Sequence, residues 1–307
     1  MIDRQLHDLL NSWADFLSKK NLATNTSLSY LRDLEGFLSF LAGYKSCIIS
    51  VAEIKQLSIQ DFRAWLACRN NSSMASRSNA RAISALRNFF KYLADYQNID
   101  NAAIFNLSFP RLRKLVPHPI SKQDAAKATR EIANFAGSSW VGARDLSILM
   151  LLYGCGLRIS EALSLRRRDI IHNADGDNNI RVFGKGSKER IVPLLPEVGC
   201  AILNYLAKCP YQATEEQPIF FGERGKALCR TYFAKRLRLF RRIFGLPEAL
   251  TAHSMRHSFA THLLSAGVDI RFLQELLGHS DLASTQIYTK VENQYLLNSY
   301  LSSHPRK

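Results

Sequence analysis

The sequence predicts a mainly α-helical protein with a small antiparallel β-sheet, divided into two domains. Apolar residues recur at helical spacing through most of the chain, whereas the short segment 180–195 combines β-branched residues with a glycine-containing turn. A proline-bearing stretch without periodicity separates a first helical part from the rest. The length of 307 residues also fits two domains, since one domain holds about 150 residues.

Apolar stripes and a capping signal predict four helices in the first hundred residues. Gly43 marks the expected end of the second helix, because glycine suits helix ends. Ser58 and Asp61, three residues apart, predict a capping box that opens the third helix. The stripes are Leu6, Leu9, Leu10, Trp13, Phe16 and Leu17 in the first helix, Leu31, Leu34, Phe37, Leu38 and Leu41 in the second, and Ile83, Leu86, Phe89, Phe90 and Leu93 in the fourth. No strand pattern lies between them, so one compact helical domain is expected.

The boundary between the domains is expected just after residue 100. Residues 99–120 lose the helical periodicity and contain Pro110, Pro117 and Pro119, which interrupt helices. The predicted division is a first domain at 1–102, a linker at 103–117 and a second domain at 118–307. Residues 1–110 hold 12 basic and 9 acidic side chains, which leaves 29 and 17 for the remainder. Most of the positive charge therefore lies in the second domain.

The second domain is expected to contain one β-hairpin among its helices. The segment IRVFGKGSKERIVPLL (180–195) has two β-rich arms around turn residues 184–187. A later helix has an apolar stripe on one face and basic residues on another; the stripe is Phe233, Leu237, Phe240 and Phe244, and the basic residues are Lys235, Arg238 and Arg242, with Arg236 and Arg241 beside them. Between residues 223 and 245, eight basic residues meet the single acid Glu223. This excess favours phosphate contacts over the alternative of a solvated charged face.

Composition points to a polyanion as partner and gives no sign of a membrane or metal. Lys and Arg number 41 against 26 Asp and Glu, and the pI is about 9.7. Charge alone leaves open a basic protein with an unrelated role. No apolar run approaches the ~20 residues of a membrane helix, and the N-terminus lacks a secretion signal, so a cytoplasmic protein is expected. The six cysteines are widely spaced, which favours reduced thiols over a zinc site or disulfides, and no nucleotide-binding loop or other cofactor motif is present.

Two segments carry candidate anion-binding residues. In YGCGLRISEALSL, Arg158 begins a helix and Glu161 follows one turn later. Because the helix dipole opposes a cation at that end, an anion or a carboxylate partner is expected for Arg158. In TAHSMRHSFATHLLSAG, His253 and Arg256 share one face of a helix and can address one anion together. The residues expected on the buried side of that helix are Phe259, Leu263 and Leu264.

The order of the candidate residues resembles that of the tyrosine recombinases. This order is Arg158, Lys185, His253, Arg256, His279 and Tyr288. The segments GLRISEAL, GKGSKER, HSMRHSFATHLL, LLGHSDLASTQIYT and the closing HPRK resemble the bacterial Xer recombinases of the phage integrase family, over nearly the whole chain. Met255 replaces a branched aliphatic residue at conserved volume. The resemblance implies a SAM-like, DNA-clamping core-binding domain followed by a tyrosine recombinase catalytic domain.

The resemblance and the chemistry of phosphodiester cleavage together suggest roles for these residues. A phenolic oxygen can attack phosphorus, so Tyr288 is the expected nucleophile that forms a 3′-phosphotyrosine and releases a 5′ hydroxyl. The planar guanidinium groups of Arg158 and Arg256 suit the non-bridging oxygens of the transition state. An alkoxide leaves poorly without a proton, and Lys185 resembles the family's general acid. Lys188 is the alternative donor, or else a phosphate contact.

The remaining candidates support this chemistry. His253 is the expected general acid/base near the nucleophile, and His279 a hydrogen-bond donor to a phosphate oxygen. Glu161 is expected to orient the first arginine or a histidine, whereas His257 and His262 are expected to have structural roles.

The resemblance also implies partners and a biological setting. Double-stranded DNA at a specific recombination site is the expected substrate, contacted by Lys188, Lys235, Arg238 and Arg242. A second, related recombinase would complete a tetramer that converts chromosome dimers to monomers at cell division and also resolves plasmid multimers. A DNA translocase at the division septum is a further implied partner. No cofactor, metal or membrane insertion is implied.

Two other classes stay open, as does the role of the C-terminal tail. A recombinase-like protein that binds DNA without cutting is disfavoured by the intact Tyr288 and arginines, and a type IB topoisomerase by the Xer-like tail and two-domain layout. In the tail, residues 294–307, an apolar stripe predicts a short helix that needs a surface to cover it. That surface is either its own domain or, as the resemblance implies, a pocket on a neighbouring protomer.

Overall fold

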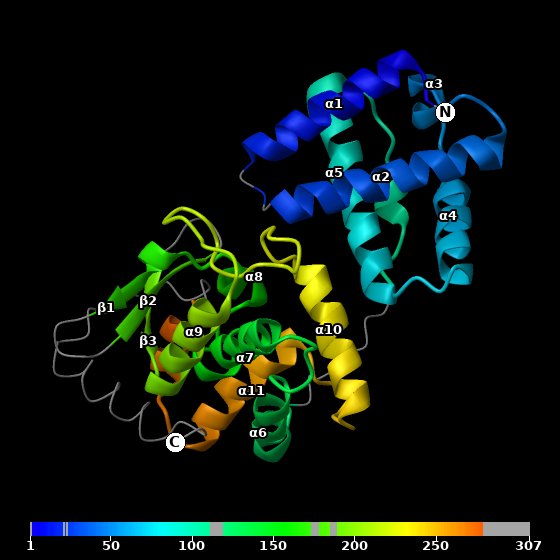
Figure 1. Ribbon diagram of the computed structural model, residues 1–307. Helices are drawn as coiled ribbons and strands as arrows, with labels where there is room; N and C mark the ends of the chain where they lie inside the picture. The colour runs from blue at the N-terminus through cyan, green and yellow to red at the C-terminus, as the bar shows by residue number, and fades with distance from the viewer. Residues whose placement is uncertain are drawn as a thin grey trace. The chain divides into compact units, whose positions relative to one another are not determined.

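The computed structural model describes residues 2–20, 22, 24–110, 119–172, 178–184 and 189–278, and Figure 1 shows their helices and strands. The chain divides into two compact units, Met1–Leu115 and Val116–Lys307. Residues 111–117 of the predicted linker lie outside the described residues, and so does the tail at 294–307. The linker boundaries therefore stay a prediction.

The first unit is helical, as predicted. Its elements are α1 (Arg4–Lys19), α2 (Thr24–Lys45), α3 (Val51–Lys55), α4 (Ile59–Asn71), α5 (Ser76–Gln97) and the 3₁₀ helix η1 (Ala103–Asn106). The four predicted helices correspond to α1, α2, α4 and α5. The short α3, capped by the Ser50 side chain, was not predicted.

The helix ends of the first unit follow local hydrogen bonding. The predicted capping residues at α4 are confirmed, because the Asp61 carboxylate accepts the Ser58 backbone N–H at 2.7 Å. The prediction that Gly43 ends the second helix is wrong, since α2 continues to Lys45. A Cβ at Gly43 would meet nothing within 4 Å, so this glycine occupies an ordinary, uncrowded helical position. Its cost to a helix, about 1 kcal/mol relative to alanine, is small beside the burial of residues such as Phe37 and Leu41.

An aromatic core holds the first unit together. Trp13 of α1 lies edge-on to Phe89 of α5, with ring centroids 5.2 Å apart, and Phe37 of α2 stacks on Phe62 of α4. Ile104 of η1 is fully buried in the same core. The start of the segment assigned to the linker therefore packs onto the first unit.

The second unit combines helices with a three-stranded sheet (Figure 1). Its elements are α6 (Lys122–Glu131), α7 (Ser139–Gly154), α8 (Ile159–Leu163), the 3₁₀ helix η2 (Arg167–Asp169), β1 (Ile170–His172), β2 (Asn178–Phe183), β3 (Glu189–Leu194), α9 (Pro196–Lys208), α10 (Arg230–Ile243), α11 (Ala252–Ser265) and α12 (Ile270–Leu277). Helix α7 is buried almost all round and packs against α6, α8, α9 and α11. A helix that is buried on nearly every side belongs at the centre of a domain, and α7 has that place in this unit.

The strands form an antiparallel sheet in the order β1-β2-β3. The predicted hairpin is confirmed as β2 and β3, which pair from Asn178 with Leu194 to Phe183 with Glu189. Ile180 and Val182 face the core, whereas Arg181 between them is exposed, which is the alternation expected of a half-buried strand. Strand β1, only three residues long, was not predicted.

No helix among the described residues has both the length and the apolar character needed to cross a bilayer.

Candidate active site and DNA-binding face

A tight turn before α8 positions Arg158. Gly156 has a left-handed backbone (φ +63°), and a Cβ there would lie 2.5 Å from the ring of the buried Phe259. Both observations require glycine at this position. The chain then enters α8 with Arg158 as its N-cap residue, which orients the arginine side chain toward Glu161 one turn on.

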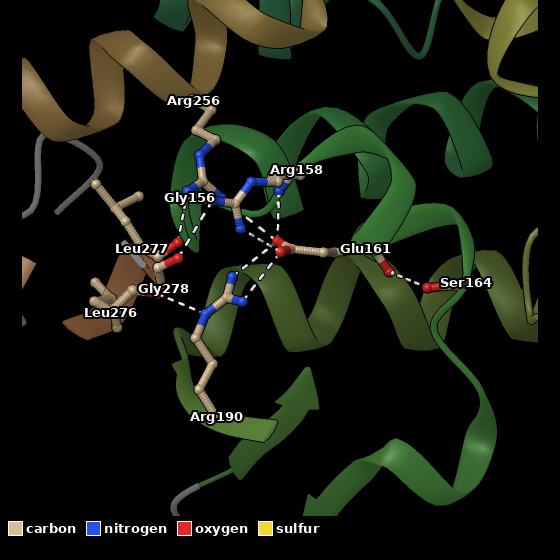
Figure 2. Close-up of polar contacts among 9 residues, drawn as sticks. All are labelled: Gly156, Arg158, Glu161, Ser164, Arg190, Arg256, Leu276, Leu277 and Gly278. Atoms are coloured by element: carbon tan, nitrogen blue, oxygen red, sulfur yellow. Dashed lines mark hydrogen bonds and ion pairs between the residues drawn. The ribbon is translucent and has the colours of Figure 1, made fainter. Parts of the chain in front are cut away.

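The carboxylate of Glu161 lies at the centre of a cluster of three arginines (Figure 2). Oε1 accepts from Nη1 of Arg158 at 2.8 Å and from Nη1 of Arg190 at 3.1 Å. Oε2 accepts from the Arg158 backbone N–H at 2.8 Å, from Nη2 of Arg190 at 2.8 Å and from Nη1 of Arg256 at 3.5 Å. The Glu161 side chain is only 4% exposed. Three cations thus surround one buried anion.

The same three arginines also bind three consecutive backbone carbonyls at the C-terminal end of α12. Arg190 donates to Leu276 O at 2.8 Å, Arg256 to Leu277 O at 2.6 Å and Arg158 to Gly278 O at 3.3 Å. Carbonyls at a helix C-terminus carry partial negative charge and lack partners within the helix, so cations there are favourable. The arginine cluster therefore joins α8, β3 and α11 to the end of α12, as Figure 2 shows.

Burial and charge set the protonation of this cluster. Burial alone would raise the pKa of Glu161, but hydrogen bonds from Arg190 and then from Arg158 outweigh it and hold this pKa below its ordinary value. Burial, followed by the positive charge of Arg158, lowers the pKa of Arg256 to about 10, although Glu161 opposes the shift. At neutral pH the carboxylate is ionised and Arg256 keeps its charge.

Helix α11 brings Arg256 into the cluster. The Thr251 side chain caps the helix by accepting the Ser254 N–H at 3.1 Å. Arg256 is 7% exposed and donates to Gly156 O at 2.7 Å, whereas His253 in the first turn is exposed. The predicted burial of Phe259 and Leu263 on this helix is confirmed.

The prediction that Leu264 is buried is wrong, because this side chain is 44% exposed. It lies in the last turn of α11, where its neighbour Leu263 already fills the core-facing position. His262, expected to be structural, is buried, and its Nδ1 lies 2.9 Å from the Tyr153 hydroxyl.

Among the candidates taken from the sequence, the structure brings together Arg158, Glu161 and Arg256. Glu161 contacts arginines and, within the described residues, no histidine. The candidates Lys185, Lys188, His279 and Tyr288 lie outside the described residues.

Sequence reasoning missed Arg190. A usable signal was present, because side chains two residues apart lie on the same face of a strand. Arg190 therefore shares a face of β3 with Val192 and Leu194, both of which are buried. An arginine on the buried side of a strand needs a partner, and here the partner is Glu161.

Helix α10 has one face that packs on the rest of the unit and another that carries basic residues. Phe233, Leu237 and Phe240 are buried, as predicted. Arg236 donates from Nε to Oδ2 of the buried Asp145 on α7 at 2.7 Å, and the same carboxylate binds the fully buried Arg144 through Oδ1.

The charges of α10 are therefore not equivalent. Arg241 donates to the backbone carbonyls of Glu248 and Leu250. Arg236 and Arg241 thus fix the helix to the rest of the unit, whereas Lys235, Arg238 and Arg242 are exposed.

Metal-binding groups are not found in the part of the chain that the structure describes: no three His, Cys, Asp or Glu residues there are placed to hold an ion. All six cysteines are described, and all are free thiols.

Clustered guanidinium groups and a helix with exposed basic residues, both in the second unit, are typical of a protein that binds a polyanion. Residues 124–294 match the family model described as "Phage integrase family", and residues 10–97 match "Phage integrase, N-terminal SAM-like domain". The chain is 42% identical to the tyrosine recombinase XerC of Rickettsia canadensis and 40% identical to that of Rickettsia bellii, in each case over the full length of both chains. The chain belongs to the phage integrase family of site-specific tyrosine recombinases, enzymes that cut and rejoin DNA.

Solved structures share this fold. The XerH recombinase bound to a palindromic difH substrate superimposes with a TM-score of 0.66 at 23% identity, covering 93% of this chain and 83% of that one. A λ integrase dimer bound to a COC′ core site gives a TM-score of 0.65 at 15% identity, covering 92% and 99%. The predicted fold class, a SAM-like helical domain and a recombinase catalytic domain with a small sheet, is confirmed, as is the resemblance to Xer recombinases of the XerC type.

Proposed function

We propose that Tyr288 attacks the scissile phosphate while Arg158 and Arg256 bind its non-bridging oxygens. The observation that carries this proposal is the arginine cluster, in which the guanidinium groups of Arg158 and Arg256 meet at the carboxylate of Glu161. A fixed donor costs no reorganisation when charge develops in the transition state, and removing one such donor typically costs 10²–10³-fold in rate. The Arg158 side chain is 40% exposed, so its guanidinium can reach a phosphate without leaving Glu161.

The reaction conserves the energy of the phosphodiester bond. The Tyr288 oxygen forms a bond to phosphorus, and the bond from phosphorus to the 5′ oxygen breaks. Lys185 gives that oxygen a proton, with Lys188 as the alternative donor, and a 5′ hydroxyl leaves. His253 takes the phenolic proton and His279 donates a hydrogen bond to a phosphate oxygen. Attack by a 5′ hydroxyl of another strand reverses these steps, so rejoining needs no cofactor.

Helix α10 is the proposed DNA-binding element of the catalytic unit, through Lys235, Arg238 and Arg242. Changing Arg238 and Arg242 together to alanine should flatten the plot of log affinity against log salt by about 1.8, because each lost phosphate contact removes ~0.9 from the slope. Duplex affinity measured between about 50 and 200 mM salt checks this.

A matched control removes two exposed arginines that already have a carboxylate partner. Arg166 and Arg168 both pair with Glu216. Their double alanine variant makes the same formal charge change and should keep the wild-type slope. An unchanged slope in the α10 variant would mean that this face is only solvated.

The proposed partner is a second, XerD-like recombinase, with which this enzyme forms a tetramer on a chromosomal site in the cytoplasm. There the pair converts chromosome dimers to monomers at cell division, resolves plasmid multimers, and responds to a DNA translocase at the septum. Support comes from the full-length similarity to proteins named XerC.

Footprinting on chromosomal DNA locates the site, and recombination between two copies of it tests the assignment. We expect strand exchange only when the partner recombinase from the same genome is added, and a covalent adduct on nicked DNA with this enzyme. Binding without any adduct would indicate a protein that does not cut, and relaxation of plasmids lacking the site would indicate a topoisomerase.

A further inference from the structure

Arg190 of β3 links the carboxylate of Glu161 to the end of α12. Its guanidinium reaches both oxygens of Glu161, at 3.1 Å and 2.8 Å, while Nε donates to Leu276 O at 2.8 Å. The side chain is 12% exposed. Of the three guanidinium groups in the cluster, only that of Arg190 touches both carboxylate oxygens; those of Arg158 and Arg256 each contact one.

We propose that Arg190 is a positioning residue for DNA cleavage: it fixes the plane of the Glu161 carboxylate and the last turn of α12, and thereby aligns Arg158 and Arg256 on the scissile phosphate. The proposal rests on the phosphate-binding role given to these two arginines above. Without Arg190, Oε1 would keep Nη1 of Arg158, and Oε2 would keep the Arg158 backbone N–H and the longer contact to Arg256. The two parallel bonds of the Arg190 fork add a planar constraint that these separate contacts do not supply.

The number of cations around Glu161 helps to decide whether Arg190 neutralises this carboxylate or orients it. Three arginines face one carboxylate, so Glu161 would keep two cationic partners without Arg190. A buried carboxylate that keeps its partners does not carry the large penalty of an unpaired charge. Arg190 makes the largest contribution to the lowered pKa of Glu161, but two cations would remain without it, and its planar fork is the feature that they would not replace.

The second contact of Arg190 places the end of α12. Gly278 ends this helix with a left-handed backbone (φ +64°), and a Cβ there would come within 3.1 Å of Nη1 of Arg190. The guanidinium thus packs directly over the glycine. His279 follows Gly278 in the sequence, so Arg190 also fixes the point from which the chain continues to His279 and Tyr288.

The test compares cleavage of two nicked duplexes that carry the recombination site. One has an ordinary scissile phosphate, and the other a methylphosphonate, in which one charged oxygen is replaced by a methyl group. We expect Arg190→Met to form the covalent adduct about 10- to 100-fold more slowly on the phosphate, as for a misaligned reacting group. On the methylphosphonate the defect should shrink several-fold, because less negative charge needs alignment with the arginines. DNA affinity should stay within about twofold of wild type.

Three further variants sharpen this comparison. Arg190→Lys keeps the charge but loses the fork, and should show a smaller defect with the same dependence on substrate. Arg181→Met removes an arginine from the adjacent strand whose partner, Glu189, is exposed, and should cleave both duplexes like wild type. Glu161→Gln combined with Arg190→Met should be no slower than the slower single variant, because the two residues act as one unit.

The results separate this inference from the proposed function. A wild-type protein that forms no adduct, or an Arg158→Met defect that is the same on both duplexes, would overturn the proposed function and the inference with it. A wild-type adduct together with normal cleavage by Arg190→Met would overturn the inference alone. An equal defect on both duplexes would also overturn it, since lost folding slows both alike. If Arg190→Met fails to fold by circular dichroism, Arg190→Lys decides by the same criteria.

Discussion

Replacing Tyr288 with phenylalanine should abolish the covalent protein–DNA adduct and leave DNA affinity within about twofold of wild type. The substitution removes one oxygen and keeps the ring, so it deletes the nucleophile without opening a cavity. Loss of a covalent nucleophile costs on the order of 10⁴-fold or more. The measurement is trapping on a nicked duplex followed by denaturing electrophoresis, with affinity measured in parallel.

Tyr44→Phe is a matched control, because this tyrosine is 56% exposed in the first unit and has no part in the proposed chemistry. It should form adduct at the wild-type rate. An adduct formed by Tyr288→Phe would assign the nucleophile to another residue.

The fold was predictable wherever a long apolar pattern exists. The stripes of α1, α2 and α5 each extend over at least three turns, so their existence could be inferred from spacing alone. Helix α3 and strand β1 are five and three residues long, too short for any period to show. The end of the second helix was wrongly predicted at Gly43, because a glycine is tolerated inside a helix that is held in place by buried residues.

The site was predictable only in part, because its contacts join distant segments. Arg158 and Glu161 are one helical turn apart, so a local argument found the pair. The contact between Arg256 and Gly156 O spans 100 residues, and the bonds from three arginines to the end of α12 follow from tertiary packing alone. Roles for Lys185, His253, His279 and Tyr288 rest on the family resemblance and stay predictions.

Counting basic residues overestimates the face of α10 that we propose binds DNA. Arg236 and Arg241 lie among the basic residues of α10, yet one binds Asp145 and the other binds backbone carbonyls. Arg190 in the hairpin is a further basic residue with an internal partner, because its guanidinium binds Glu161 and is largely shielded from solvent. In this protein, arginines that hold the framework and arginines available to phosphate lie within a few residues of one another.

Arg256→Lys should slow adduct formation by about 10²- to 10³-fold and make the remaining activity sensitive to pH. Arg256 binds Gly156 O through Nη1 and Leu277 O through Nη2, at 2.7 and 2.6 Å, and an ammonium group cannot reproduce this planar fork. The phosphate then loses an aligned donor, which accounts for the size of the effect.

The pH dependence follows from the environment that lowers the pKa of Arg256 to about 10. The ordinary pKa of lysine is about 10.4, roughly two units below that of arginine, and the same burial and neighbouring cations would hold the pKa of a lysine there below this ordinary value, closer to neutrality. A lysine is charged below its pKa and neutral above it. The ratio of variant to wild-type cleavage rate should therefore fall as the pH rises from about 7 to about 9.

The measurement is single-turnover adduct formation by both proteins across this pH range. Arg87→Lys is the control, because Arg87 also donates to two backbone carbonyls, those of Phe105 and Leu107, but belongs to the first unit, whereas the arginine cluster belongs to the second. Its ratio to wild type should stay near one at every pH. A flat ratio for Arg256→Lys would show that the substituted lysine keeps its charge, and a wild-type rate would remove Arg256 from the phosphate clamp.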